Sequence, residues 1–225
     1  MILLSNVSKV YPNGSTALDD ISFFIERGEF VFIVGPSGSG KSTLIKLLMH
    51  EEVATSGQVI INNADVAALK RREIPYLRRS MGVVFQDFRL LPKKTVFENV
   101  AFAMDIIGAS RKEIRKQVPN VLSLVGLSHK AKSYPNELSG GQKAKLLLTK
   151  FMLDGSNVLI LDEPTRNFSP LSGPQVRRVL SGFPGVIISV SHDRKFLSDV
   201  CDKLYSLTDV GLIATDKSAL EDDSF

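Results

Sequence analysis

Cysteine is nearly absent from this chain, because Cys201 is the one cysteine among 225 residues. A lone cysteine excludes an internal disulfide and a cysteine metal cluster, so a reducing cytoplasm fits the composition, and we interpret Cys201 as a core residue. The chain also lacks any apolar run near the roughly 20 residues that a membrane-spanning helix needs. Its longest runs, such as Val186–Ile188, have the length of strands. A role at a membrane would therefore require a partner.

Repeats, low-complexity segments and a clear secretion signal are also missing. Met1–Leu4 is apolar, but no basic segment precedes it, so it predicts a first strand rather than a signal peptide. The net charge of +4 is small and does not indicate a DNA-binding protein. The basic cluster of Lys70–Arg72 and Arg78–Arg79 could serve RNA or acidic lipid headgroups, or could only keep the chain soluble. No aromatic stacking pattern surrounds the cluster, which makes RNA the weaker interpretation.

The sequence does show strand patterns that alternate with helix patterns, as in an α/β protein. Residues 1–34 are rich in strand patterns, and the later strand patterns are almost continuously apolar and alternate with helices. Such strands predict a parallel sheet that is covered on both faces. From Thr95 to Val125, and again from Lys143 to Leu153, the apolar spacing is helical. We therefore predict one domain over residues 1–225, with an N-terminal antiparallel β subdomain and a helical insert over about 95–155.

A glycine-rich loop stands between the apolar run Phe30–Val34 and a helical pattern that we expect to begin at Thr43. This strand–loop–helix context is what a phosphate-binding loop requires. Backbone N–H groups of such a loop converge on phosphate oxygens, and the helix adds the positive end of its dipole. Lys41 would reach the β- and γ-phosphates and Ser42 would bind Mg²⁺. The alternative is a chance glycine turn. The predicted phosphate-binding residues are Gly35, Pro36, Ser37, Gly38, Ser39, Gly40, Lys41, Ser42 and Thr43.

Two acidic residues follow the apolar run Val158–Leu161. Asp162 ends the expected buried strand, where its carboxylate could orient Mg²⁺ or a water bound to it. Glu163 would face the other way and could act as the general base that polarises the attacking water. The simpler alternative is a strand that ends in acidic turn residues.

The segment Leu138–Gln142 reads Leu-Ser-Gly-Gly-Gln and precedes a helical pattern. Ser139 could simply cap that helix, with Gly140 and Gly141 forming a turn. The same residues, with Gln142, could instead form a second anion site at the start of the helix. One chain has no second phosphate for such a site, so this interpretation needs two chains.

Together these motifs resemble the nucleotide-binding domain of the ATP-binding cassette (ABC) ATPases, over nearly the whole chain. The resemblance implies a phosphate-loop fold that binds ATP and Mg²⁺ in a head-to-tail homodimer. It also implies that Tyr11 stacks on adenine, that Gln86 contacts Mg²⁺ and the attacking water, and that His192 contacts the γ-phosphate. Glu163 would be the base. A turn tyrosine at Tyr11 and a structural histidine at His192 are the simpler alternatives.

A finer resemblance covers residues 1 to about 142. Arg72–Arg79 and Val83–Pro92 are similar to the cell-division ATPases of this family. That resemblance implies a membrane partner of the FtsX type and a peripheral location on the cytoplasmic face of the membrane. Candidate docking residues for the partner follow Gln86, although plain core packing explains them equally well; they are Phe88, Leu90, Leu91 and Pro92.

The second half departs from that pattern. Lys143–Lys150 lacks the expected glutamine–arginine run, and Phe168-Ser169 replaces a leucine–aspartate pair. Ser191–Phe196 instead resembles the soluble ABC-F branch, which acts on ribosomes. We therefore expect a chimera joined within Leu138–Gln142. Because Ser169 keeps a hydrogen bond but no charge at the dimer seam, we also expect ATP binding with slow hydrolysis. The alternative functions are an ATP-binding scaffold with weak turnover and a ribosome-associated ATPase.

Overall fold

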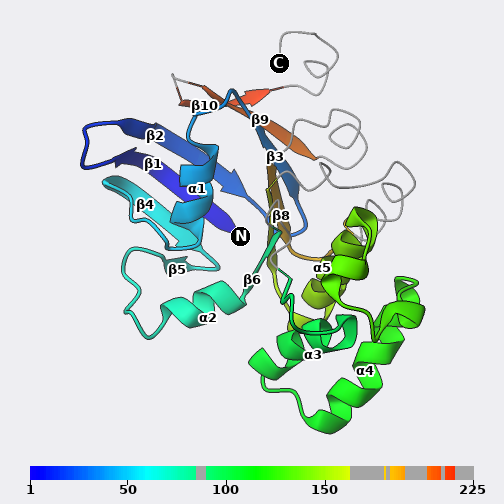
Figure 1. Ribbon diagram of the computed structural model, residues 1–225. Coiled ribbons are helices and arrows are strands. Elements are labelled where there is room, and N and C mark those ends of the chain that lie inside the picture. The colour runs from blue at the N-terminus through cyan, green and yellow to red at the C-terminus, as the bar shows by residue number, and fades with distance from the viewer. Residues whose placement is uncertain (85–89, 163–179, 181–182, 191–201, 209–210, 216–225) are drawn as a thin grey trace.

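The computed structural model describes residues 1–84, 90–162, 180, 183–190, 202–208 and 211–215. In this part of the chain two β-sheets lie beside each other, and a group of helices lies at one end of the larger sheet (Figure 1). The sequence also predicts a short helix around Lys195–Val200, and these residues lie outside the described part of the chain.

The smaller sheet is antiparallel and has the strand order β2-β1-β4-β5. Apolar residues alternate along β1, so that Ile2 and Leu4 are buried while Leu3 between them is only partly so. The turn at 12–14 joins β1 to β2, as predicted. This sheet confirms the predicted N-terminal antiparallel subdomain. Its strands are β1 (Ile2–Val10), β2 (Thr16–Ile25), β4 (Ser56–Ile61) and β5 (Ala64–Asp65).

The larger sheet has the order β10-β9-β3-β8-β7-β6. All pairs are parallel except β10 with β9, so the predicted parallel sheet is confirmed apart from this antiparallel edge. Every residue of β3 and β8 is buried, which explains why these strands are apolar apart from Ser189 of β8. The strands are β3 (Phe30–Val34), β6 (Met81–Val84), β7 (Val158–Asp162), β8 (Val186–Val190), β9 (Lys203–Thr208) and β10 (Gly211–Thr215).

Separate groups of apolar residues cover the two faces of the larger sheet. On one face, α1 (Lys41–Leu48) and the antiparallel sheet share a core with β3, β7 and β8, in which Leu44 packs with Ile2 and Ile188. On the other face, α5 (Gly140–Asp154) contributes Ala144 and Leu147 to a core with Phe32. The sheet is thus covered on both faces, so a site can form only where its strands end.

The helical group is built from α3 (Val96–Ile106), α4 (Arg111–Leu124) and α5, and α2 (Ile74–Arg79) stands apart from it. Capping boxes at Thr95 and Ser110 start α3 and α4, which divides the continuous helical stretch that we predict over 95–125. Leu146 of α5 packs with Val100 and Val118, so the three helices share one core. None of the helices that the structure describes is long and apolar enough to cross a membrane.

Candidate nucleotide-binding site

The glycine-rich loop follows β3 directly and ends where α1 begins at Lys41, two residues earlier than predicted. Gly40 caps the helix with φ +97°, and Gly35 has φ +147°, both in the region that favours glycine. A Cβ at Gly35 would lie 2.3 Å from the carbonyl oxygen of Leu207. One at Gly40 would lie 2.1 Å from the carbonyl oxygen of Ala17. The loop therefore needs glycine here, because the backbones of β9 and β2 press directly against it.

Lys41 folds back across this loop. Its Nζ donates hydrogen bonds to the carbonyl oxygens of Gly35 and Pro36, at 2.6 and 2.7 Å, and lies 3.4 Å from Ser39 Oγ. These bonds hold the ammonium group over the loop, next to the first N–H groups of α1. Positive charge and backbone donors therefore converge at one helix N-terminus, which is the arrangement that binds phosphate.

Asp162 stands at the same edge of the sheet. The registers place both Asp162 of β7 and Ile33 of β3 beside Val190 of β8, so one strand separates the acid from the strand that leads into the loop. Burial raises the pKa of the Asp162 carboxyl above its ordinary value, and the positive charge of Lys41 acts in the opposite direction. The carboxylate and the ammonium group thus interact across the loop.

The donor set at this edge suits Mg²⁺. The Ser42 hydroxyl and the Asp162 carboxylate are oxygen ligands, and Mg²⁺ commonly takes one or two protein oxygens and completes its shell with phosphate oxygens and water. Within the described ranges, no three His, Cys, Asp or Glu side chains gather into a metal site. A magnesium ion here would therefore depend on the phosphates of a bound nucleotide.

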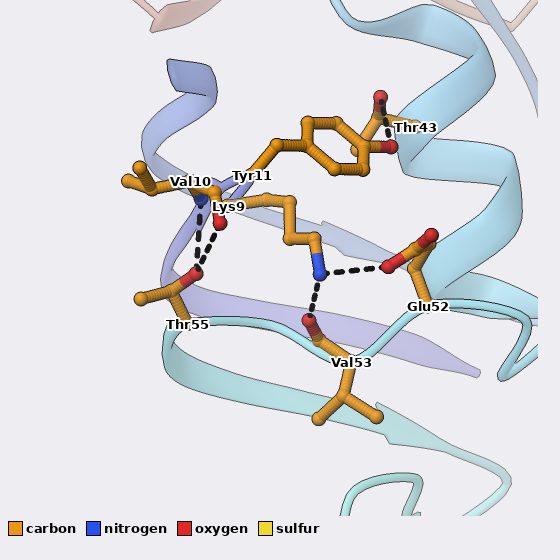
Figure 2. A network of polar contacts seen from close by, with 7 residues as sticks. All are labelled: Lys9, Val10, Tyr11, Thr43, Glu52, Val53 and Thr55. Carbon is orange, nitrogen blue, oxygen red and sulfur yellow. Dashed lines mark hydrogen bonds and ion pairs between the residues drawn. The ribbon is translucent and has the colours of Figure 1, made fainter. Parts of the chain in front are cut away.

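Tyr11 lies against the first turn of α1 (Figure 2). Its hydroxyl is 3.3 Å from Oγ1 of Thr43, a side chain that is 8% exposed. The Nζ of Lys9 lies 5.2 Å from the centre of the Tyr11 ring. The structure thus brings the predicted adenine-stacking residue next to the phosphate loop, 32 residues away in the sequence.

The Leu-Ser-Gly-Gly-Gln segment forms the start of α5, three residues before the helix that we predict. Ser139 Oγ accepts a hydrogen bond from the Gln142 N–H at 3.3 Å, and Gln142 Oε1 accepts one from the Ser139 N–H at 3.0 Å. This capping box confirms that Ser139 caps the helix. Ser139 is also exposed, so the helix N-terminus remains accessible to a partner.

Three predicted catalytic residues, Gln86, Glu163 and His192, lie outside the described residues. In the sequence they follow the last residues of β6, β7 and β8, which are Val84, Asp162 and Val190. Phe88, Phe168 and Ser169 lie outside as well, and the roles of all six remain predictions.

Sequence reasoning missed Lys9, although a signal for it was present. Lys9 lies in β1 and Tyr11 directly follows its last residue, Val10; side chains two residues apart in an extended chain lie on the same side. The close approach of Ala17 to the loop had no such signal, because it depends on how the two sheets pack.

The fold and the site define a phosphate-loop nucleotide-binding protein, and comparison with known proteins makes this specific. The family model for the ABC transporter matches residues 18–166. The chain belongs to this family and is an ABC ATPase. The cell division ATP-binding protein FtsE of Bacillus subtilis is 43% identical over 228 residues, which cover 100% of both chains. FtsE of Escherichia coli is 38% identical, over 93% of this chain and 96% of its own.

Solved structures agree with this assignment. The ATP-binding cassette MJ0796, in a dimeric post-hydrolysis state with ADP and phosphate, matches with a TM-score of 0.84 and 30% identity, over 96% of this chain and 99% of its own. The cbiO1 protein of Clostridium perfringens, part of the transporter complex cbiONQ, has a TM-score of 0.86 and 28% identity. The match covers 98% of this chain and 90% of cbiO1. The predicted ABC-type phosphate-loop fold is therefore confirmed.

The chimera interpretation is not supported. The Bacillus subtilis relative aligns with the whole chain, through Leu138–Gln142 and on through the second half, so no change of lineage marks that segment. The unusual residues at 143–150 and 168–169 are substitutions within a chain that is FtsE-like from end to end. The resemblance of the second half to the ABC-F branch is likewise not supported.

Proposed function

We propose that the chain binds Mg²⁺ and ATP between two copies arranged head to tail, and that closure of this dimer drives a membrane protein of the FtsX type in cell division. The observation that carries the proposal is the convergence of Lys41 and Asp162 at the loop between β3 and α1. Ammonium, carboxylate and helix N-terminus together match what a magnesium–triphosphate group requires.

In the proposed mechanism one set of residues binds the nucleotide and another set acts at the γ-phosphate. Lys41 neutralises charge on the β- and γ-phosphates, and Ser42 and Asp162 supply oxygen ligands to Mg²⁺. Glu163 polarises the attacking water, while Gln86 and His192 contact the metal and the γ-phosphate. Positioning and charge stabilisation supply the rate enhancement in phosphoryl transfer.

The dimer follows from the second anion site. At the start of α5, Ser139 is exposed, Gly140 is partly exposed and Gly141 is buried, so the Ser139 hydroxyl and the Gly140 N–H are the donors best placed for the γ-phosphate held by the other copy. The dimeric state of MJ0796 with ADP and phosphate supports this arrangement.

The membrane partner is supported by the FtsE relatives and by a narrow pocket beside α3. Leu90 and Leu91, two of the proposed docking residues, line this pocket together with Phe102 of α3, which is 38% exposed. Asn99 and Lys150 also line the pocket, so it suits one small side chain of a partner helix that has a polar group beside it. The proposal places the chain on the cytoplasmic face of the membrane through that contact.

Hydrolysis tests the proposal directly. We expect the purified chain to release phosphate from ATP only when Mg²⁺ is present, and the Glu163→Gln variant to bind ATP without releasing phosphate. Because Ser169 carries no charge, turnover should be slow, and a rate on the order of 1 s⁻¹ would contradict that expectation. Phosphate release that survives both EDTA and Glu163→Gln would contradict the proposed mechanism.

A further inference from the structure

Lys9 is anchored more firmly than an ordinary surface lysine. Its Nζ lies 2.8 Å from Oε2 of Glu52 and donates a hydrogen bond to the carbonyl oxygen of Val53 at 2.9 Å (Figure 2). The Lys9 side chain is only 12% exposed. Charge-assisted bonds in a partly buried position hold the ammonium group at one point, rather than leaving it to sample many rotamers.

That fixed ammonium group lies over the ring of Tyr11. The distance of 5.2 Å from Nζ to the ring centre is within the range of a cation–π contact. At the far end of the ring, the Tyr11 hydroxyl lies 3.3 Å from Oγ1 of Thr43 in α1. The Tyr11 N–H donates to the Ser15 carbonyl oxygen at 2.9 Å, which fixes the backbone as well. The ring is therefore held at its face, at its hydroxyl and at its main chain.

Glu52 and Val53 belong to the segment that joins α1 to β4, whereas Lys9 belongs to the end of β1 and Tyr11 directly follows that strand. Thr55 reinforces this junction, because its Oγ1 accepts a hydrogen bond from the Val10 N–H at 2.9 Å. The Tyr11 ring is thus braced against the helix that follows the phosphate loop from two directions, and its position is coupled to that of the loop.

We infer that Lys9, held by Glu52, is a positioning residue for the purine base of the bound nucleoside triphosphate. The ammonium group occupies one face of the Tyr11 ring, which directs the base to the opposite face. The cation also draws electron density from the ring, and an electron-poor ring stacks better on an electron-rich purine. This inference rests on the proposed function, since it assumes that ATP binds at the loop and that Tyr11 contacts its base.

The test separates the base from the phosphates. ATP and inorganic triphosphate share the contacts of the phosphate loop, but only ATP has a base to stack. We expect Lys9→Met to weaken ATP binding by about threefold to tenfold, the scale of a cation–π contact, and to leave triphosphate binding unchanged. Lys9→Arg keeps the charge over the ring and should restore most of the ATP affinity. Dissociation constants from isothermal titration calorimetry provide the measurement.

A second ion pair gives the matched control. Lys203 and Glu29 lie 2.6 Å apart, and this pair is separate from the Tyr11 ring. Lys203→Met should leave both affinities unchanged. If Lys9→Met fails to fold, Glu52→Gln loosens the same ammonium group. This variant should again lower the affinity for ATP and leave the affinity for triphosphate unchanged.

Each other outcome overturns the inference in a recognisable way. Equal weakening of ATP and triphosphate by Lys9→Met would mean that Lys9 only supports the fold of the loop, and no effect on either would mean that it does not act on the site. If Tyr11→Ala leaves ATP binding unchanged, the stacking surface itself is absent. A wild-type chain that binds neither ligand would overturn the proposed function, and this inference with it.

Discussion

At the scale of single residues, the charge of Lys41 is the element of the site that nothing nearby replaces. Its hydrogen bonds to the carbonyl oxygens of Gly35 and Pro36 hold the ammonium group where the β- and γ-phosphates would lie. We expect Lys41→Ala to weaken ATP binding about 100-fold, since several charge-assisted hydrogen bonds are lost together. Lys46→Ala removes an exposed lysine of the same helix and should change nothing. Fluorescence titration with a labelled ATP measures both, and unchanged affinity in Lys41→Ala would contradict the assignment.

Asp162 gives a prediction for the nucleotide-free protein. Because burial raises the pKa of its carboxyl in the folded state, the folded chain holds this proton more tightly than the unfolded chain does. The charged carboxylate therefore lowers stability at neutral pH, and this penalty fades as the pH falls through the raised pKa. Asp162→Asn should raise the melting temperature at pH 7 by about 1–2 °C, with a smaller gain at more acidic pH.

The same variant should lose the stabilisation that Mg²⁺ and ATP give to the wild type, because an amide is a poorer magnesium ligand than a carboxylate. Differential scanning calorimetry between pH 4 and 8 tests both effects, with the exposed Asp19→Asn as control. A lower melting temperature for Asp162→Asn at pH 7 would show that its carboxylate stabilises the empty site.

Residues of the phosphate loop could be predicted from sequence because the motif is contiguous and its signal is local. Gly35 and Gly40 needed no knowledge of their neighbours, although the reason they must be glycine is the approach of Leu207 and Ala17. The spacing of Lys9 and Tyr11 was a usable signal for their contact, but the anchoring of Lys9 by Glu52 had no signal, because Glu52 is 43 residues away in the sequence.

At the scale of elements, α3, α4 and α5 all begin with a capping box, and in α4 and α5 the capping residue is a serine. Ser110 and Ser139 both accept a hydrogen bond from the third residue of the helix at 3.3 Å. Each serine-to-alanine change should cost about 1 kcal/mol of stability, measured by urea unfolding. Because only Ser139 belongs to the proposed second anion site, Ser139→Ala alone should also lower ATP hydrolysis, by about tenfold or more. An equal loss of activity in Ser110→Ala would mean that the cap, and no phosphate contact, explains the effect.

Strands with an apolar run and the longer strands of the N-terminal sheet were predicted, whereas β9 and β10 were not. β3, β7 and β8 are buried on both faces and show it in their sequences. β9 mixes polar and apolar residues without a regular alternation and β10 is partly exposed, so neither gave a strong signal. The division between α3 and α4 had a usable signal in the paired Thr95…Glu98 and Ser110…Glu113 motifs, which mark two helix starts.

At the scale of the whole molecule, sequence reasoning identified the fold but misread the second half. Departures at 143–150 and 168–169 suggested a change of lineage, whereas the full-length FtsE relatives show one continuous chain. Local motifs identify a family more securely than they identify a junction, because a few substitutions near a motif leave the fold unchanged. The packing of the β1–β2 hairpin on the phosphate loop lay beyond prediction for another reason, since it depends on how two sheets pack around α1.

We propose that the working site is made by two copies of the chain. Hydrolysis of ATP as a function of the concentration of the chain itself, with oligomer size recorded by light scattering in the same samples, tests it most directly. We expect a rate that rises faster than linearly with protein concentration, together with an ATP-dependent dimer. The Glu163→Gln variant should lose hydrolysis but still form the dimer. Hydrolysis that stays strictly proportional to protein concentration while the chain remains a monomer would contradict the proposal of a site made by two copies.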